Sequence, residues 1–182
     1  MKKIKSVKKQ KTYDRPNWDE LFMYEAYAAA TRSSCKKFHT GAIIVKEHRI
    51  ISSGYNGAPP GIENCLQRGC RKEEEGIDFQ TKGTGTCRGT HAEMNAMNQI
   101  ARRDLEGTIM YTVYLPCSSC AKAIAGDKIR EVVYSQVYDE PDLLTKEMFA
   151  EAGVKLRQFK YLDLEKQFQR IRDIQNQTYS SK

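Results

Sequence analysis

The spacing of hydrophobic residues predicts a chain in which helices and strands alternate. A first helix is expected from Asn17, a suitable N-cap, to about Ser33, because Trp18 and the apolar residues after it recur at helical spacing. Runs rich in β-branched and aromatic residues predict five strands, over 41–45, 49–53, 108–114, 130–134 and 154–159. Helical spacing returns from 91 to about 101, from 116 to 125, from 141 to 152 and over 164–174. This order predicts one α/β structure with helices packed on a mixed sheet.

Residues 54–90 interrupt this alternation. The segment opens with Gly54-Tyr-Asn-Gly-Ala-Pro-Pro-Gly61 and continues with three cysteines, a Lys-Glu-Glu-Glu run and a glycine-rich stretch at 82–86. No regular element is expected in it. Since the sequence shows neither a repeat nor a domain boundary, we expect a single domain over 16–182 with a cysteine-containing insert at about 57–90.

Length and charge add little to this picture. The 182 residues suit one domain, and the chain has neither an apolar run of 18 residues nor the apolar stretch of a secretory signal. We therefore expect a cytoplasmic protein without a membrane span. The net charge of +7 is concentrated in residues 1–15, whose seven basic and one acidic side chains leave only +1 for residues 16–182. We expect residues 1–15 to form a basic flexible tail, and the charge favours specific nucleic-acid binding only weakly.

Two short motifs carry recognisable chemistry. His91-Ala-Glu93 and Pro116-Cys-Ser-Ser-Cys120 each begin a predicted helix. Cys117 and Cys120 are spaced to point the same way from one helical turn, and His91 supplies a third ligand from a neighbouring helix. One imidazole and two thiolates suit zinc, and three protein ligands leave a fourth position for water. Glu93 is placed to move protons beside that water.

Simpler interpretations exist for each motif alone. A Cys-x-x-Cys pair also occurs in redox sites and in structural zinc knuckles, and an isolated His-x-Glu carries almost no information. The two motifs together, each at the start of a helix and separated by a strand, favour the catalytic zinc site. A redox pair gives no reason for Pro116 or for the His-Ala-Glu motif.

At these residues the sequence resembles the zinc-dependent cytidine and deoxycytidylate deaminases, whose signature is H-x-E followed by P-C-x-x-C. The stretch 54–61 and the long insert before His91 resemble the deoxycytidylate (dCMP) deaminase family in particular. The similarity extends through 129–134 and covers about residues 20–160.

The resemblance implies a cytidine-deaminase-like three-layer α/β/α fold with a five-stranded mixed sheet. It implies that zinc-bound hydroxide attacks C4 of cytosine, which converts dCMP to dUMP and ammonia and supplies thymidylate synthesis. His91, Cys117 and Cys120 would be the zinc ligands and Glu93 the proton shuttle. Substrate contacts would come from the side chain of Asn56, the backbone of Ala92 and the ring of Tyr138.

The 5′-phosphate of such a substrate needs a cationic or N–H-rich clamp. The candidates lie just before the first strand and in the insert: Lys36, Lys37, His39, Arg71, Lys72 and Arg88. For each of them an ordinary solvated surface charge is the alternative.

Four cysteines remain outside the predicted catalytic site: Cys35, Cys65, Cys70 and Cys87. Stable disulfides are not expected in an intracellular protein, so buried free thiols and a metal are the alternatives. Some dCMP deaminases carry a second, structural zinc in this region, and an irregular insert would gain stability from one.

The family resemblance also implies a homo-oligomer, in many members a hexamer, with dCTP as activator and dTTP as inhibitor. Gly57, Gly61 and Arg102 are the candidates for such a regulatory site. The apolar stripe of the last helix is interpreted as core, with an oligomer contact as the alternative. Rival functions are deamination of cytidine, of a free base or of tRNA adenosine, and a non-enzymatic nucleic-acid-binding module that uses zinc structurally.

Overall fold

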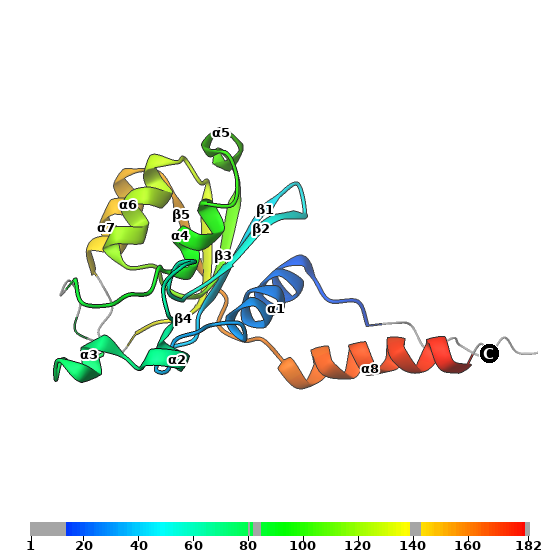
Figure 1. The fold of residues 1–182 in the computed structure, drawn as a ribbon. Coiled ribbons are helices and arrows are strands. Elements are labelled where there is room, and N and C mark those ends of the chain that lie inside the picture. The colour runs from blue at the N-terminus through cyan, green and yellow to red at the C-terminus, as the bar shows by residue number, and fades with distance from the viewer. Residues whose placement is uncertain (1–13, 80, 82–84, 139–142, 181–182) are drawn as a thin grey trace, which may run out of the picture. The chain divides into compact units, whose positions relative to one another are not determined.

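A five-stranded mixed sheet organises the protein (Figure 1). The computed structural model describes residues 14–79, 81, 85–138 and 143–180. The strands are β1 Gly41–Lys46, β2 Arg49–Tyr55, β3 Ile109–Tyr114, β4 Glu131–Gln136 and β5 Lys155–Gln158. Their order across the sheet is β2-β1-β3-β4-β5; β1 is antiparallel to β2 and β3, and β3, β4 and β5 are mutually parallel. The predicted α/β fold and all five strands are confirmed.

Helices cover both faces of the sheet. Helix α1 (Trp18–Ala30) packs on one face, against Ile43, Val45 and Tyr111. Helices α4 (Ala92–Met97), α6 (Ser118–Gly126) and α7 (Leu143–Glu151) pack on the other, against the alternate residues of the same strands. Because β1, β3 and β4 are buried on both sides, their sequences read as nearly continuous apolar runs.

Two glycines allow helices to approach the sheet closely. A Cβ built on Gly41 would lie 2.2 Å from the carbonyl oxygen of Ala26 in α1. A Cβ on Gly54 would lie 2.4 Å from the carbonyl oxygen of Ala92 in α4. Both separations are far inside van der Waals contact, so any side chain at either position would push its helix away.

The insert contains more regular structure than expected. Two short helices, α2 (Cys65–Arg68) and α3 (Arg71–Glu74), lie in the segment for which no element was predicted. Asn64 and Gln67 form a capping box at the start of α2, an available signal that the composition of the segment obscured. The helix predicted from 91 to 101 ends at Met97 and is followed by a separate short helix, α5 (Arg102–Leu105).

The chain divides into two compact units. One is Trp18–Leu162; the other joins residues 14–17 with α8 (Leu164–Ser180), where the Asp14 carboxylate accepts from Lys166 and Arg170. The apolar residues Leu164, Phe168, Ile171 and Ile174 of α8 are exposed, contrary to the prediction that this stripe forms core. The expected tail over 1–15 lies almost entirely outside the described residues and stays a prediction. The single domain over 16–182 also stays a prediction.

The lengths and hydrophobicities of the helices bear on whether the chain can span a membrane. Among the helices that the structure describes, none combines the length and the hydrophobicity needed to cross a bilayer.

Candidate active site

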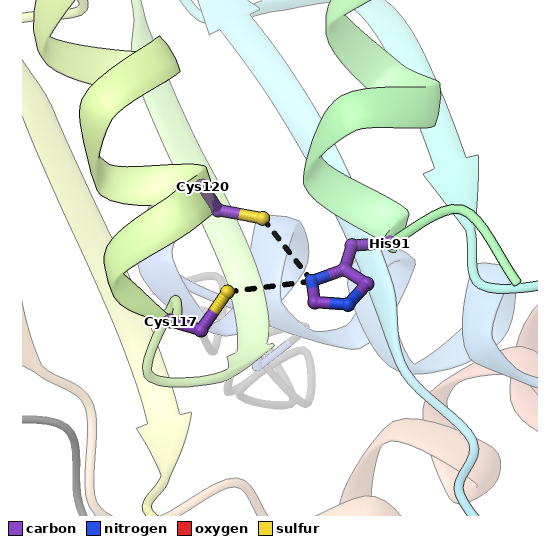
Figure 2. Close-up of side chains that lie close together, drawn as sticks. All are labelled: His91, Cys117 and Cys120. Atoms are coloured by element: carbon purple, nitrogen blue, oxygen red, sulfur yellow. Dashed lines mark hydrogen bonds between the residues drawn. The ribbon is translucent and has the colours of Figure 1, made fainter. Parts of the chain in front are cut away.

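The two sequence motifs meet at one point in the structure (Figure 2). His91 immediately precedes α4, Cys117 immediately precedes α6, and Cys120 lies in the first turn of α6. The His91 Nδ1 atom is 3.5 Å from the Cys117 sulfur and 3.3 Å from the Cys120 sulfur. Within the described parts of the chain, these residues are the one group of three or more whose ligand atoms all lie within 4.8 Å of one another.

The fold explains why these residues converge. Helix α6 follows the carboxyl end of β3 and leads into the parallel strand β4, so its first turn opens at that edge of the sheet. Helix α4 reaches the same edge because Gly54 in β2 lets its backbone lie directly on the sheet. Both helices therefore present their amino ends to one place, where the helix dipoles favour thiolates.

The protonation of the three side chains fits a metal-binding set. The pKa of Cys117 is lowered to about 4, chiefly because the Cys120 thiol donates a hydrogen bond to its sulfur and also because His91 does, against the opposing effect of burial. The same hydrogen bond and burial raise the pKa of Cys120, and the bond to Cys117 raises that of His91. Two sulfurs and one ring nitrogen thus share protons that a cation would displace, and this donor set is one that zinc prefers.

Glu93 lies in the first turn of α4 and is 5% exposed. Burial raises the pKa of its carboxyl group above the usual value, although the charge of His91 opposes this effect. A carboxyl group that holds its proton more readily than an exposed glutamate is suited to receiving and delivering protons.

An aromatic cluster that the sequence did not reveal lies close to the motifs. The Phe38 ring contacts Tyr114 at 4.5 Å and stacks with Tyr138 at 5.1 Å between ring centroids, and Tyr114 stacks with Tyr138 at 5.0 Å. Burial, and then the charges of Glu93 and Cys117, raise the pKa of Tyr138. Tyr138, predicted to contact substrate, therefore lies beside the site, and Phe38 and Tyr114 are additions to it.

Asn56 holds the loop that carries Phe38. Its amide nitrogen donates to the Phe38 carbonyl oxygen at 2.7 Å, and its Oδ1 accepts from the Thr40 N–H at 3.0 Å. The predicted contact of Asn56 with a substrate stays a prediction, since the structure gives its side chain a role in positioning this loop. Ala92 is fully buried as the first residue of α4, where helix geometry leaves its N–H without an acceptor in the helix.

Most of the phosphate-clamp candidates are engaged elsewhere. Lys37 pairs with Glu73 at 2.8 Å and Arg71 with Glu75 at 2.9 Å. Lys72 is buried and donates to the carbonyl oxygens of Phe79 and Thr81, while the His39 ring contacts the Cys35 carbonyl oxygen at 2.9 Å. Lys36 is exposed. Arg88 differs from all of these because its Nη1 atom is buried and has no hydrogen-bond partner among the residues that the structure describes.

The four remaining cysteines lie near one another, but among the described residues they do not form a metal-binding group of three or more. Burial, and then the charges of Cys35, Cys70 and Cys87, raise the pKa of Cys65. The backbone N–H groups of Lys37 and Phe38 both donate to the Cys35 sulfur, at 3.4 and 3.3 Å. In the described chain, no three of these sulfurs lie within 4.8 Å of one another.

The proposed regulatory residues make separate contacts in the fold. Gly57 forms an isolated bridge with Thr90, with backbone hydrogen bonds of 3.2 and 2.8 Å. Gly61 lies in an exposed turn at a φ of 84°. Arg102, in α5, pairs with Asp127 and donates to the Gly126 carbonyl oxygen, which joins α5 to the end of α6. Since these contacts lead to different partners, a shared regulatory site stays a prediction.

Comparisons with known proteins agree with this site. Residues 16–136 match the family described as the cytidine and deoxycytidylate deaminase zinc-binding region. A deoxycytidylate deaminase of Saccharomyces cerevisiae is 38% identical over 150 residues, which make up 82% of this chain and 47% of the yeast protein, so the chain spans about half of that relative. A deoxycytidylate deaminase of Mycobacterium phage D29 is 40% identical over 122 residues, 66% of this chain and 95% of the phage protein.

A solved structure shares the fold as well. The dCMP deaminase of cyanophage S-TIM5, crystallised with dCMP and dUMP, superimposes with a TM-score of 0.65 at 28% identity and covers 80% of this chain and 98% of its own. The family match extends over both motifs, and the fold and the metal-binding residues are those described above. The chain belongs to the cytidine and deoxycytidylate deaminase family, whose members bind zinc.

Proposed function

We propose that the protein deaminates dCMP to dUMP and ammonia and so supplies dUMP for thymidylate synthesis. The observation that carries this proposal is the similarity in fold and sequence to a phage dCMP deaminase crystallised with both dCMP and dUMP. The chemistry is consistent with it, because His91, Cys117 and Cys120 form a zinc-type donor set beside a buried carboxyl group.

Different residues of the chain would have different roles in this reaction. His91, Cys117 and Cys120 would hold the zinc ion. When bound, zinc lowers the pKa of a coordinated water to roughly 7 and so supplies a nucleophile for C4 of cytosine at neutral pH. Glu93 would accept a proton from the attacking water and deliver protons to the ring nitrogen and to the departing amino group, which balances water and dCMP against dUMP and ammonia.

The aromatic cluster would hold the base. Phe38, Tyr114 and Tyr138 pack on one another, with Tyr138 near Glu93 and Cys117, and stacking on aromatic rings is how proteins commonly retain a single nucleobase. Asn56 would act on this cluster by fixing the loop that bears Phe38.

The test of the proposal is ammonia release from dCMP, deoxycytidine, cytidine and a tRNA hairpin, with and without dCTP. Turnover of dCMP in preference to the others is expected; an absence of dCMP turnover under both conditions contradicts the proposal. In the Glu93→Gln variant we expect turnover to fall by about 10²–10⁴-fold while the zinc content stays near that of the wild type. A large loss of zinc from this variant would show that Glu93 serves the metal site instead.

The same proposal includes assembly and regulation. We infer a cytoplasmic homo-oligomer, with a hexamer as the expected size, that dCTP activates and dTTP inhibits; the support is the resemblance to dCMP deaminases. Light scattering and initial rates measured with each nucleotide test these points separately.

A structural zinc at Cys35, Cys65, Cys70 and Cys87 is a further part of the proposal. Its support is the proximity of the four thiols and the two backbone N–H groups that donate to the Cys35 sulfur, as they would to a thiolate ligand. Metal analysis decides this point, since one zinc per purified chain rejects the second site in favour of free thiols.

A further inference from the structure

Arg88 has an unusual hydrogen-bonding state. Its Nη1 atom is buried, and within the described residues it has no acceptor. A guanidinium group is always charged, and burying one of its donors without an acceptor is costly, so such groups are normally paired. The Nη1 atom of Arg170 is in the same state, but Arg170 donates through Nε and Nη2 to Asp14. For Arg88 we look for an acceptor that the described residues do not supply.

The other cations of this region show what ordinary pairing looks like here. Three consecutive glutamates of the insert each take one basic partner: Glu73 pairs with Lys37, Glu74 with Arg68 and Glu75 with Arg71. Lys72, although buried, donates to two carbonyl oxygens. The three glutamates of this run are thus already paired with other cations.

The nearby thiols do not provide a hydrogen-bond acceptor for the Arg88 Nη1 atom either. Burial raises the pKa of Cys65, and the charge of Arg88 acts in the opposite direction, so the guanidinium lies near this thiol. None of the sulfur atoms in the described part of the chain, however, accepts a hydrogen bond from Nη1. The cysteine cluster is close to Arg88 without being its acceptor.

The position of Arg88 relates it to the catalytic residues. It lies three residues before His91, a span of at most about 10 Å along the chain. Between them, Thr90 pairs through both backbone hydrogen bonds with Gly57, the residue after Asn56. The backbone segment that bears Arg88 is therefore held next to the proposed zinc ligand His91 and to the residue that positions the Phe38 loop.

We propose that Arg88 binds the 5′-phosphate of the substrate and thereby selects nucleotides over nucleosides, an inference that rests on the proposed function. A phosphate group offers the acceptor oxygens and the negative charge that Nη1 lacks, and the planar guanidinium fork matches phosphate geometry. Because the donor is already desolvated, a phosphate-bearing substrate gains a strong contact that a nucleoside cannot make.

The test compares kcat/KM for dCMP and for deoxycytidine in the wild-type enzyme and in Arg88→Gln. We expect this substitution to lower the value for dCMP about 100-fold or more, with the value for deoxycytidine changed about twofold or less. Arg88→Lys, which keeps the charge but not the fork, should fall between the wild type and Arg88→Gln for dCMP. Arg68→Gln is the matched control, because Arg68 is an exposed arginine of the insert that is paired with Glu74. In the Arg68→Gln enzyme, the ratio of kcat/KM for dCMP to that for deoxycytidine should equal the wild-type ratio.

Zinc content and thermal unfolding of each variant show whether it is folded. An unchanged ratio of the two kcat/KM values in a folded Arg88→Gln or Arg88→Lys enzyme overturns the inference. An equal loss with both substrates does so too, since it means that Arg88 supports the catalytic residues instead. The proposed function fails separately, if the wild-type enzyme releases no ammonia from dCMP.

Discussion

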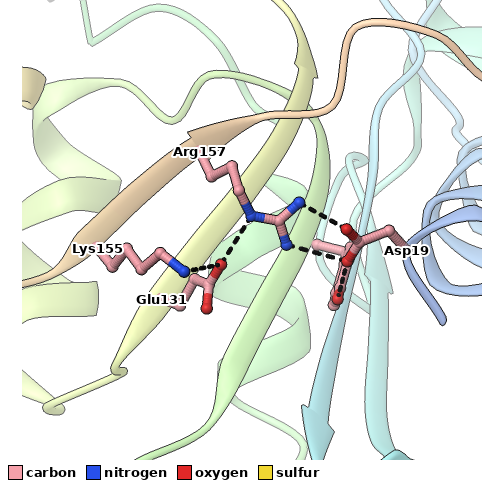
Figure 3. Close-up of polar contacts among 5 residues, drawn as sticks. Asp19, Glu131, Lys155 and Arg157 are labelled. Atoms are coloured by element: carbon pink, nitrogen blue, oxygen red, sulfur yellow. Dashed lines mark hydrogen bonds and ion pairs between the residues drawn. The ribbon is translucent and has the colours of Figure 1, made fainter.

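The two faces of the sheet differ in the kind of polar side chains that they bury and in how these side chains are paired. On the face that α1 covers, Asp19, Tyr111, Glu131 and Arg157 form a network in which each side chain is a partner of another (Figure 3). On the face that α4 and α6 cover, two sulfurs and a ring nitrogen compete for protons beside the buried carboxyl group of Glu93. Each face also carries a cluster of buried apolar side chains.

The hydrogen-bond geometry of this network shows that its side chains pair with one another. Arg157 donates two hydrogen bonds to the Asp19 carboxylate, at 2.6 and 3.0 Å, and a third to Glu131 at 3.0 Å. The Tyr111 hydroxyl donates to Asp19 at 2.7 Å, and Lys155 adds a longer contact to Glu131. This network joins α1 to β3, β4 and β5 and needs no ligand. The two sets differ in chemistry, because carboxylates paired with a guanidinium need no further partner, whereas two thiols and an imidazole form a donor set that a metal ion can bind.

The largest expected effects come from truncating one buried side chain on each face of the sheet. Cys120→Ala removes a proposed zinc ligand, so we expect the zinc content to fall well below one per chain and dCMP turnover to be lost. Met23→Ala, in the core under α1, should lower the free energy of unfolding by about 2–5 kcal/mol and leave kcat near that of the wild type below its melting temperature. Metal analysis, urea unfolding and initial rates measure these effects, and a Cys120→Ala enzyme that retains activity would remove this residue from the site.

An intermediate effect is expected from the two glycines that admit helices to the sheet. Gly54→Ala and Gly41→Ala each place a Cβ about equally close to helix backbone, and such overpacking costs about 1–3 kcal/mol. Only Gly54→Ala displaces the helix that carries Glu93, so kcat should fall about 100-fold in this variant and change little in Gly41→Ala. Equal kcat values in the two variants would show that α4 accommodates the methyl group without moving the site.

The smallest expected effect is a pH dependence on the α1 face. Burial opposes ionisation of Asp19, but hydrogen bonds from Arg157 and Tyr111 and the charge of Arg157 outweigh it, so the pKa of Asp19 lies below its usual value. A lowered pKa in the folded state contributes stability above the unfolded pKa of about 3.9, and this contribution is lost as the pH falls through the folded pKa. The difference in urea midpoint between the wild type and Asp19→Asn should therefore shrink from pH 6 to pH 3. A difference that is constant over this range would mean that Asp19 ionisation does not contribute.

The sequence predicted much of this protein for a local reason. The five strands and the long helices follow from the period of apolar residues, and the set His91, Cys117 and Cys120 follows from motif spacing at helix starts. Such features depend on neighbours within one or two turns, which the sequence states directly. The capping box of Asn64 and Gln67 is equally local, but it starts a helix of only one turn in a segment whose composition predicts no regular element.

What the sequence by itself determined is therefore the order of elements, the donor set for zinc and the family. Only the tertiary structure decided which of the six phosphate-clamp candidates buries a guanidinium nitrogen without an acceptor among the described residues. It also decided that Asn56 holds the Phe38 loop and that Phe38 and Tyr114 each stack with Tyr138. Each of these depends on which acceptor or ring arrives from a distant part of the chain. A lysine or arginine reads the same in the sequence whether a glutamate meets it or not, and its role is settled by the contacts that folding supplies.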